Sequence, residues 1–269
     1  MFGFTKEEIR RYSRQIVLKR VGGKGQKKLR ESSVLVVGAG GLGCPVSVYL
    51  TAAGIGKLGL LDFDVVDISN LQRQILHFTK DVGEPKTISA AEKLRSLNPN
   101  IIIQTIETRL TPKNAREIVK QYDYVIDGSD NFATKYIIND ACIIENIPFT
   151  IAGILKFEGQ ILTVIPKQTS CYRCIFPAPP PPGMVPSCSQ AGVFGAIPGI
   201  IGSIQASETI KYLLDFGKLI TNGLLLIDIE NLYFQKVSIQ KNNNCRACGE
   251  TPEDLLKVFD YYQGEICET

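Results

Sequence analysis

The segment VLVVGAGGLG, residues 34–43, constrains the fold more than any other part of the chain. Its run of β-branched and apolar residues predicts a buried strand, and Gly38, Gly40 and Gly43 follow in the spacing G-x-G-x-x-G. This spacing is typical of the first turn of a dinucleotide-binding βαβ unit, where backbone amides at a helix N-terminus face phosphate groups. The segment therefore predicts a nucleotide-binding sheet, although the glycines alone do not identify the nucleotide.

Strand and helix patterns alternate along the rest of the chain, which predicts a doubly wound, mostly parallel α/β sheet. Strands are expected at 33–37, 57–63, 101–106, 123–127, 149–153 and 159–165, with two more inside 223–239. Helices are expected from the glycine loop to near Gly54 and at 86–97, 112–121, 131–145 and 196–216. The final pair of strands, which no helix separates, predicts an antiparallel C-terminal part.

The chain also begins and ends with predicted helices. Thr5 and Glu8 form a capping box for a helix to about Leu18, with Ile9, Tyr12, Ile16 and Val17 facing inward. A short amphipathic helix is expected at 251–262. Between them, the proline-rich segment 176–187 is incompatible with a helix or a central strand and predicts a semi-rigid crossing loop.

The charge balance excludes several classes of protein. The chain has 30 basic and 27 acidic residues with no block of like charge, whereas nucleic-acid-binding proteins usually present a clustered basic face. No apolar run approaches the roughly 20 residues of a membrane-spanning helix. The start, MFGFTKEEIRRYSRQ, lacks the apolar core of an export signal. We therefore expect a cytoplasmic protein with no nucleic-acid partner and no membrane contact.

Four of the eight cysteines form two C-x-x-C pairs, Cys171 with Cys174 and Cys245 with Cys248. Disulfides are rare in a reducing cytosol, and two such pairs are typical of a tetrahedral Zn²⁺ site with four thiolate ligands. Four protein ligands leave no open position for a substrate. The predicted zinc site is therefore structural and joins two distant stretches of the chain.

Charged residues that follow the predicted strands narrow the choice of nucleotide. Asp62 ends the second strand, where an acid binds a ribose hydroxyl, and up to this point NAD and ATP fit equally well. Arg73 and Lys86 come next, and two cations indicate more negative charge than one pyrophosphate carries. Asp130 follows the fourth strand, where a Mg²⁺ ligand beside a polyphosphate would lie. The alternative role for Asp130 is a cap for the helix 131–145.

A series of ordered motifs makes a family resemblance specific. They are RYSRQI at 11–16, GAGGLG at 38–43, LLDFDVVDISNLQRQ at 60–74, VGEPK at 82–86, DGSDN at 127–131, CYRC at 171–174, SCSQAGVFG at 187–195 and CRAC at 245–248. Together they resemble the MoeB/ThiF family, relatives of the ubiquitin-activating enzymes, over about residues 5–250. The resemblance implies ATP-dependent adenylation of the C-terminal glycine of a ubiquitin-like sulfur carrier, MoaD or ThiS. The carrier then receives sulfur as a thiocarboxylate for molybdopterin or thiamine synthesis.

The resemblance also implies roles for individual residues. Those implied to contact ATP or its Mg²⁺, with the glycines of the loop, are Gly38, Gly40, Gly41, Gly43, Asp62, Asn70, Arg73, Gln74, Lys86, Asp130 and Asn131. Asp62 is assigned to the ribose, Arg73 and Lys86 to the phosphates, and Asp130 to the metal. Arg14 would reach the nucleotide from the partner subunit of a homodimer. No general base is needed, because the carboxylate of the carrier is already ionised at neutral pH.

The resemblance implies one adenylyltransferase domain over 1–250, with a tail at 251–269. The domain divides into N-terminal helices at 1–31, a nucleotide-binding half at 32–150 and a carrier-binding and zinc half at 151–250. The chain ends 21 residues after Cys248, so we expect sulfur from a separate sulfurtransferase, a rhodanese or a cysteine desulfurase.

Several alternatives stay open at this point. A NAD-dependent oxidoreductase would leave Arg73, Lys86 and Asp130 without a role, and a tRNA-modifying dehydratase would need a basic surface. A non-catalytic scaffold would not need every nucleotide motif. The resemblance offers Cys188 for attack on the carrier adenylate or for handling persulfide sulfur, against an accessible but idle thiol.

No catalytic role is expected for two other residues. His77, the single histidine, is expected to be packed or on the surface. Cys44 lies at a helix N-terminus, where the pKa of a thiol tends to fall, or it simply packs there.

Overall fold

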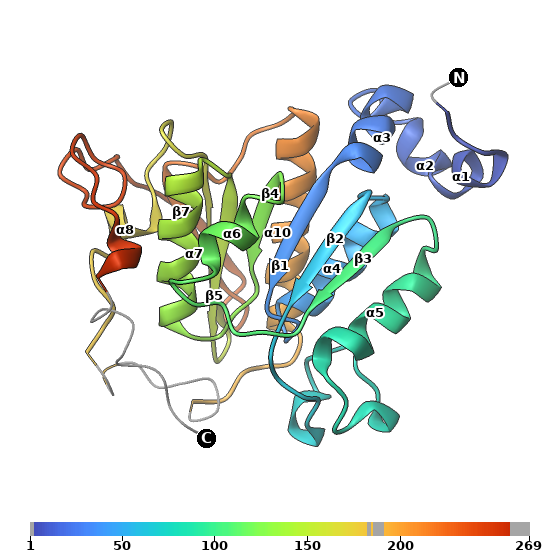
Figure 1. Cartoon of the computed structure of the whole chain (residues 1–269), viewed down its shortest axis with the longest axis horizontal. Helices are drawn as coiled ribbons and strands as arrows, with labels where there is room; N and C mark the ends of the chain where they lie inside the picture. The colour runs from blue at the N-terminus through green and yellow to red at the C-terminus, as the bar shows by residue number, and fades with distance from the viewer. Residues whose placement is uncertain (1–2, 182–183, 185–190, 259–269) are drawn as a thin grey trace.

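The computed structural model describes residues 3–181, 184 and 191–258, and these form one α/β sheet covered by helices on both faces (Figure 1). The strand order is β3-β2-β1-β4-β5-β6-β7-β8. The strands are β1 (Ser33–Val37), β2 (Lys57–Leu61), β3 (Ile102–Ile106), β4 (Tyr124–Asp127), β5 (Phe149–Leu155), β6 (Glu158–Val164), β7 (Gly223–Asp228) and β8 (Tyr233–Ser238). The neighbours from β3 to β5 are parallel, and those from β5 to β8 are antiparallel. The predicted doubly wound, mostly parallel sheet with an antiparallel C-terminal part is confirmed.

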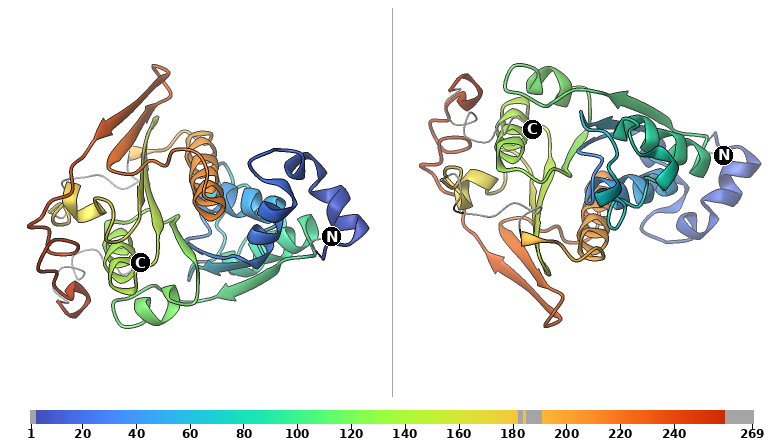
Figure 2. Two further views of the ribbon diagram at one scale, coloured as in Figure 1. Left: turned by 90° about the horizontal axis from the view of Figure 1, so that it is seen from above. Right: turned by 90° about the horizontal axis from the view of Figure 1, so that it is seen from below.

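The helices divide into two layers around this sheet (Figures 1 and 2). They are α1 (Lys6–Arg11), α2 (Ser13–Ile16), α3 (Gly22–Glu31), α4 (Gly43–Ala53), α5 (Lys86–Leu97), α6 (Ala115–Val119), α7 (Phe132–Glu145), α8 (Tyr172–Ile175) and α10 (Ile197–Leu214), with 3₁₀ turns η1 (Ile68–Asn70), η2 (Thr79–Asp81) and η3 (Leu255–Lys257). Successive side chains of a strand point to opposite faces. Val34 and Val36 accordingly pack with α4, α5 and α10, while Leu35 and Val37 pack with α6 and α7. Burial on both faces explains why β1 is apolar from Val34 to Val37 instead of alternating.

The N-terminal segment differs from the single helix expected there. The capping box of Thr5 and Glu8 is present, but the helix breaks at Tyr12 into α1 and α2. The ring of Tyr12 is buried over Gly54, where an added Cβ would lie 2.7 Å from it, and its hydroxyl accepts a hydrogen bond from Asn98. The expectation that Ile9 and Val17 face inward is wrong, because they are 38% and 73% exposed.

Two other elements are shorter than expected. Residues 112–114 form a turn before α6, in which the Asn114 side chain accepts a hydrogen bond from the Thr111 amide. In the described part of the predicted tail helix, the chain forms only the 3₁₀ turn η3, so the expectation of a helix from 251 is wrong there. Residues 259–262 lie outside the described part of the chain.

The crossing segment starts and ends at two fixed places in the fold. At its start, the Tyr136 hydroxyl of α7 donates to the carbonyl oxygen of Ala178 over 2.6 Å. At its end, Lys156 in the β5–β6 turn donates its amide to Gly192 and accepts the amide of Phe194. The described residues before and after this segment are therefore anchored to α7 at Ala178 and to the β5–β6 turn at Gly192 and Phe194. Among the described helices, none combines the length and apolar character that a membrane span needs.

Candidate nucleotide site and four-cysteine centre

The glycine loop joins β1 to α4 at the carboxyl end of the parallel strands. Gly38 has φ of 96°, a left-handed conformation that favours glycine. A Cβ on Gly43 would lie 1.8 Å from the carbonyl oxygen of Gly38, so the first turn of α4 packs directly on the end of β1. The loop keeps its shape only with these glycines, and the backbone stays free to approach a ligand closely.

A cleft of about 850 Å³, counting its part open to solvent, lies over this loop. It sits where the strand order reverses between β1 and β4, the usual ligand position in an open α/β sheet. The predicted residues that line it are Gly38, Gly40, Gly41, Asp62, Arg73, Gln74, Lys86, Asp130 and Asn131. Segments from four regions of the sequence thus meet in one cleft, as the motifs predict.

Asp62 is held in place by the glycine loop. Its Oδ2 accepts a hydrogen bond from the Ala39 amide at 2.7 Å, and its Oδ1 accepts one from the Asp64 amide at 2.9 Å. Burial raises the pKa of the Asp62 carboxyl, while the nearby Lys86 ammonium acts in the opposite direction. The carboxylate is therefore fixed in orientation before any hydroxyl group binds to it.

Both predicted phosphate ligands already contact acceptors of the protein itself. The ammonium of Lys86 lies 3.0 Å from Asp64 Oδ2, and the guanidinium of Arg73 donates to the carbonyl oxygen of Ser69 at 3.0 Å. Asp64 was missed by the sequence reasoning, although it belongs to the same DFD segment as Asp62. A phosphate that binds Lys86 would compete with Asp64 for the ammonium.

The segment after β4 separates the roles of two neighbouring residues. The Asn131 side chain accepts a hydrogen bond from the Thr134 amide and caps α7. The alternative role of Asp130 as the cap is therefore wrong, and Asp130 is an exposed side chain on the wall of the cleft. Its carboxylate is accessible to a cation held between the protein and a phosphate.

A buried lysine that sequence reasoning missed holds this segment in place. Lys135 lies 2.7 Å from Asp127 Oδ2 and also donates to the carbonyl oxygens of Ser129 and Ala152. It fixes the loop after β4 against β5. A lysine inside a helical pattern normally suggests an exposed face, so only the preceding acid in DGSDN could have indicated its burial.

The cleft also has an aromatic wall that the motifs did not reveal. The guanidinium of Arg109 lies 4.0 Å from the centroid of the Phe63 ring, a cation–π contact, and both residues line the cleft.

The remaining predicted residues do not line the cleft. Gly43 packs behind the loop, and the Asn70 side chain accepts the Asp67 amide within η1, just before Arg73. Arg14 is exposed on α2, beside the amino ends of β1 and β2, whereas the glycine loop follows the carboxyl end of β1 (Figure 1). Cys188 lies outside the described residues.

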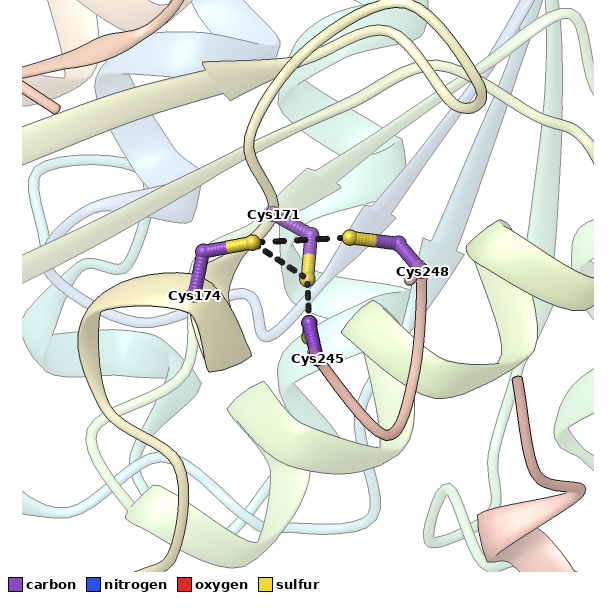
Figure 3. A group of neighbouring side chains, drawn as sticks. All are labelled: Cys171, Cys174, Cys245 and Cys248. Carbon is purple, nitrogen blue, oxygen red and sulfur yellow. Dashed lines mark hydrogen bonds between the residues drawn. The ribbon is translucent and has the colours of Figure 1, made fainter. Parts of the chain in front are cut away.

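The structure decides two predictions about cysteines, one for Cys44 and one for the two C-x-x-C pairs. Burial raises the pKa of the Cys44 thiol to about 12, so the tendency of a helix N-terminus to lower it does not apply, and Cys44 packs beneath the loop. The four paired cysteines do come together, beside α7 on the face of the sheet that α6 and α7 cover (Figure 3).

The geometry of this four-cysteine centre suits a tetrahedral metal ion. Cys171 Sγ lies 3.9 Å from Cys174 Sγ and 3.7 Å from Cys245 Sγ, and the sulfurs of Cys174 and Cys248 are 3.5 Å apart. Four sulfurs at about 2.3 Å from Zn²⁺ stand about 3.8 Å from one another. Mutual hydrogen bonding among the four sulfurs lowers the pKa of Cys174 and Cys245 and raises the pKa of Cys171 and Cys248.

Side chains of helix α7 form hydrogen bonds with the segment that carries the first cysteine pair. The guanidinium of Arg173, inside the CYRC segment, forms two hydrogen bonds of 2.8 Å with the carboxylate of Asp140, and both residues are buried. Asn139 accepts the amide of Tyr172 at 2.9 Å. The first cysteine pair is thereby fixed to the same helix whose N-terminus borders the nucleotide cleft.

Comparison with known proteins agrees with this geometry. The sequence profile described as ThiF family matches residues 12–247. The sulfur carrier protein adenylyltransferase of Thermus thermophilus is 47% identical over 263 residues, which cover 96% of this chain and 97% of that protein. The adenylyltransferase and sulfurtransferase MOCS3 of Culex quinquefasciatus is 48% identical over 260 residues, or 96% of this chain and 59% of that protein.

The fold is also found in a solved structure. The crystal structure of Escherichia coli MccB with MccA-N7isoASN has a TM-score of 0.80 and 23% identity, over 93% of this chain and 76% of that one. At this identity the likeness concerns the fold alone.

Proposed function

The chain belongs to the ThiF family, and from this premise we propose that it adenylates the C-terminal glycine of a ubiquitin-like sulfur carrier with ATP. The name of the Thermus thermophilus relative, which matches nearly end to end, supports the carrier as substrate. The observation that carries the proposal is the cleft itself, in which Arg73, Lys86 and Asp130 surround the glycine loop. A hydride-transferring enzyme has no need for this set of charges.

The chemistry requires little beyond positioning and charge. A carboxylate is a poor electrophile, and joining it to AMP supplies a good leaving group. Asp62 would bind the ribose, Arg73 and Lys86 would stabilise the departing pyrophosphate, and Asp130 would hold Mg²⁺ against the phosphates. The attacking carboxylate of the carrier is ionised at neutral pH, so the single histidine is not required as a base.

Exchange of labelled pyrophosphate into ATP tests this function. We expect exchange that depends on a MoaD- or ThiS-like carrier with an intact C-terminal glycine and on Mg²⁺. A carrier that lacks the terminal glycine is the matched control and should support none. Exchange without any carrier, or reduction of NAD by the purified protein, would contradict the proposal. Running both carriers in parallel decides between the molybdopterin and thiamine pathways.

The four-cysteine centre is proposed to hold one structural Zn²⁺ through Cys171, Cys174, Cys245 and Cys248. The sulfur spacings support a tetrahedral ion, and four protein ligands leave no position for substrate. We expect about one zinc ion per chain by elemental analysis of protein purified without chelator. Absence of any bound metal would count against the site.

A homodimer is proposed to complete the nucleotide site. Arg14 cannot line the cleft of its own chain, because α2 lies at the opposite end of β1. A second subunit could bring its α2 to the cleft and place Arg14 near the phosphates.

Sulfur is proposed to come from a separate rhodanese or cysteine desulfurase. The MOCS3 relative is named both adenylyltransferase and sulfurtransferase, so its name pairs adenylyl transfer with sulfur transfer.

Cys188 is proposed as the thiol that receives the activated carrier or its sulfur. Adenylate formation uses no thiol, so Cys188→Ala should keep pyrophosphate exchange near the wild-type rate. The same variant should impair thiocarboxylate formation with a sulfur donor present. Thiocarboxylate formed at the normal rate would exclude a catalytic role for Cys188.

A further inference from the structure

His77 lies directly beneath the glycine loop. It is 3% exposed, and its Nε2 is 2.9 Å from the carbonyl oxygen of Ala39. The Cys44 thiol donates to the same oxygen at 3.4 Å. The carbonyl oxygen of Ala39 is therefore held on the protein side of the loop, away from the cleft. The mechanism proposed above gives His77 no part in the reaction.

The direction of this carbonyl determines where the next amide points. In a trans peptide the C=O of Ala39 and the N–H of Gly40 point in opposite directions. Gly40 lines the cleft, so its N–H is turned toward the space in which the phosphates would lie. Rotation of this peptide would reverse the arrangement and present a carbonyl oxygen to an anion. Glycine permits such a rotation, because it adopts positive and negative φ with similar ease.

The protonation of His77 is set by the groups packed around it. A carbonyl oxygen only accepts hydrogen bonds, so Nε2 must carry a proton. Nδ1 lies 2.8 Å from the Ser89 hydroxyl, whose single hydrogen can be donated either to the neutral ring or to Asp81 Oδ2 at 3.0 Å. Asp81 Oδ2 already accepts from Lys93 at 2.6 Å and from the Phe78 amide at 2.8 Å, and Lys93 also donates to Ser89 at 3.2 Å. The Ser89 hydroxyl hydrogen can therefore turn from Asp81 to the ring without leaving the carboxylate unsatisfied. The chain Lys93–Ser89–His77–Ala39 has a donor and an acceptor at every contact.

We propose that His77 is a positioning residue that locks the Ala39–Gly40 peptide, so that the Gly40 amide faces the phosphates of the bound nucleotide. The inference rests on the proposed nucleotide site at the glycine loop. It assigns to the only histidine a role in ATP affinity without contact with ATP. The buried ring holds the carbonyl oxygen of Ala39 in place. Asp62 restrains the same residue by accepting the Ala39 amide.

Nitrogen NMR tests the hydrogen-bond arrangement in the wild-type protein. Because the chain has one histidine, protein labelled with ¹⁵N-histidine gives the signals of His77 alone. We expect the neutral tautomer with the proton on Nε2, with or without nucleotide. The tautomer with the proton on Nδ1 would overturn the proposal, since it cannot donate to Ala39. This measurement needs no variant and does not depend on ATP binding.

Calorimetric titration with ATP and Mg²⁺ tests the consequence for affinity. Loss of one oriented amide donor is expected to weaken ATP binding about tenfold in His77→Leu. His77→Gln, whose side-chain amide can donate to the same carbonyl, should remain within about threefold of the wild type. In steady state, the effect should fall on the KM for ATP and leave the KM for the carrier unchanged.

Val119→Ala is the matched control. Val119 is fully buried on the other face of the sheet, so this variant loses stability without touching the loop. If it binds ATP as weakly as His77→Leu, the loss reflects stability and the proposal is overturned. Equal affinity of His77→Leu and the wild type would also overturn it. A wild-type protein that binds no ATP would instead refute the nucleotide site, while the tautomer measurement would still test the hydrogen bond.

Discussion

At the residue scale, three of the acids near the cleft have different roles. Asp62 and Asp127 are buried and hydrogen-bonded to neighbouring groups, whereas Asp130 is exposed and caps no helix. Asp130→Ala should therefore fold normally and, if Asp130 is the metal ligand proposed above, lose carrier adenylation by a factor of about 10² or more. Circular dichroism and pyrophosphate exchange on the same preparation measure both effects. The control is Glu117→Ala, which removes an exposed acid on α6 that does not line the cleft. Asp130→Ala activity within a few-fold of the control would contradict the assignment.

The buried histidine predicts a pH dependence of stability. Burial lowers the pKa of His77 from its ordinary value of 6.5. Below about pH 6.5 the unfolded chain takes up a proton that the folded protein resists, so the free energy of unfolding decreases as the pH falls. The charged groups that act on the ring are Lys86, Lys93 and Asp62, and Asp81 is joined to it through Ser89. Urea unfolding between pH 7 and 5.5 should show a steeper loss for wild type than for His77→Gln. Parallel losses would show that His77 does not titrate in this way.

Individual residues could be predicted only as far as their contacts are local in sequence. The glycines of the loop, Arg73 in LLDFDVVDISNLQRQ and Lys86 in VGEPK follow from the motifs. Lys135 and His77 could not be found in this way, because their partners come from other strands and loops. The high pKa of Cys44 has the same origin, since burial by several elements outweighs the local helix N-terminus.

At the scale of the element, the first cysteine pair depends on a buried ion pair. Arg173→Leu leaves the carboxylate of Asp140 buried without its cation, which should lower the free energy of unfolding by about 3–5 kcal/mol. The double variant Arg173→Leu/Asp140→Leu removes both charges and should recover part of that loss. Chemical denaturation of the two variants with metal bound measures the difference. A double variant with a lower free energy of unfolding than Arg173→Leu alone would contradict this account.

Strands and long helices were predictable because their patterns extend over several turns or pleats. The expected strands at 33–37 and 123–127 and the expected helix at 86–97 agree with β1, β4 and α5 to within a residue. The N-terminal helix was not predictable, because its break at Tyr12 depends on Gly54 and on Asn98, which are distant in sequence.

At the scale of the whole molecule, the position of Arg14 predicts that active sites are shared between subunits. Arg14→Ala and Asp130→Ala subunits should each be inactive as homodimers. Mixed dimers contain one composite site in which both residues are intact, so co-refolded subunits should recover up to about one quarter of the wild-type activity by random pairing. Purification through two different tags isolates the mixed dimer for assay. No recovery in a verified mixed dimer would show that Arg14 does not act across the interface.

Helix α7 connects the two functional regions of the molecule. Asn131 caps it beside the cleft, while Asn139 and Asp140 on the same helix hold the CYRC segment. Its 14 residues span about 21 Å as one hydrogen-bonded unit. Removal of metal should therefore accelerate amide hydrogen exchange along α7 up to the turn after Asn131, and not only around the cysteines. Loss of the ion at the cysteines would then increase deuterium uptake at the opposite end of α7, next to the nucleotide cleft.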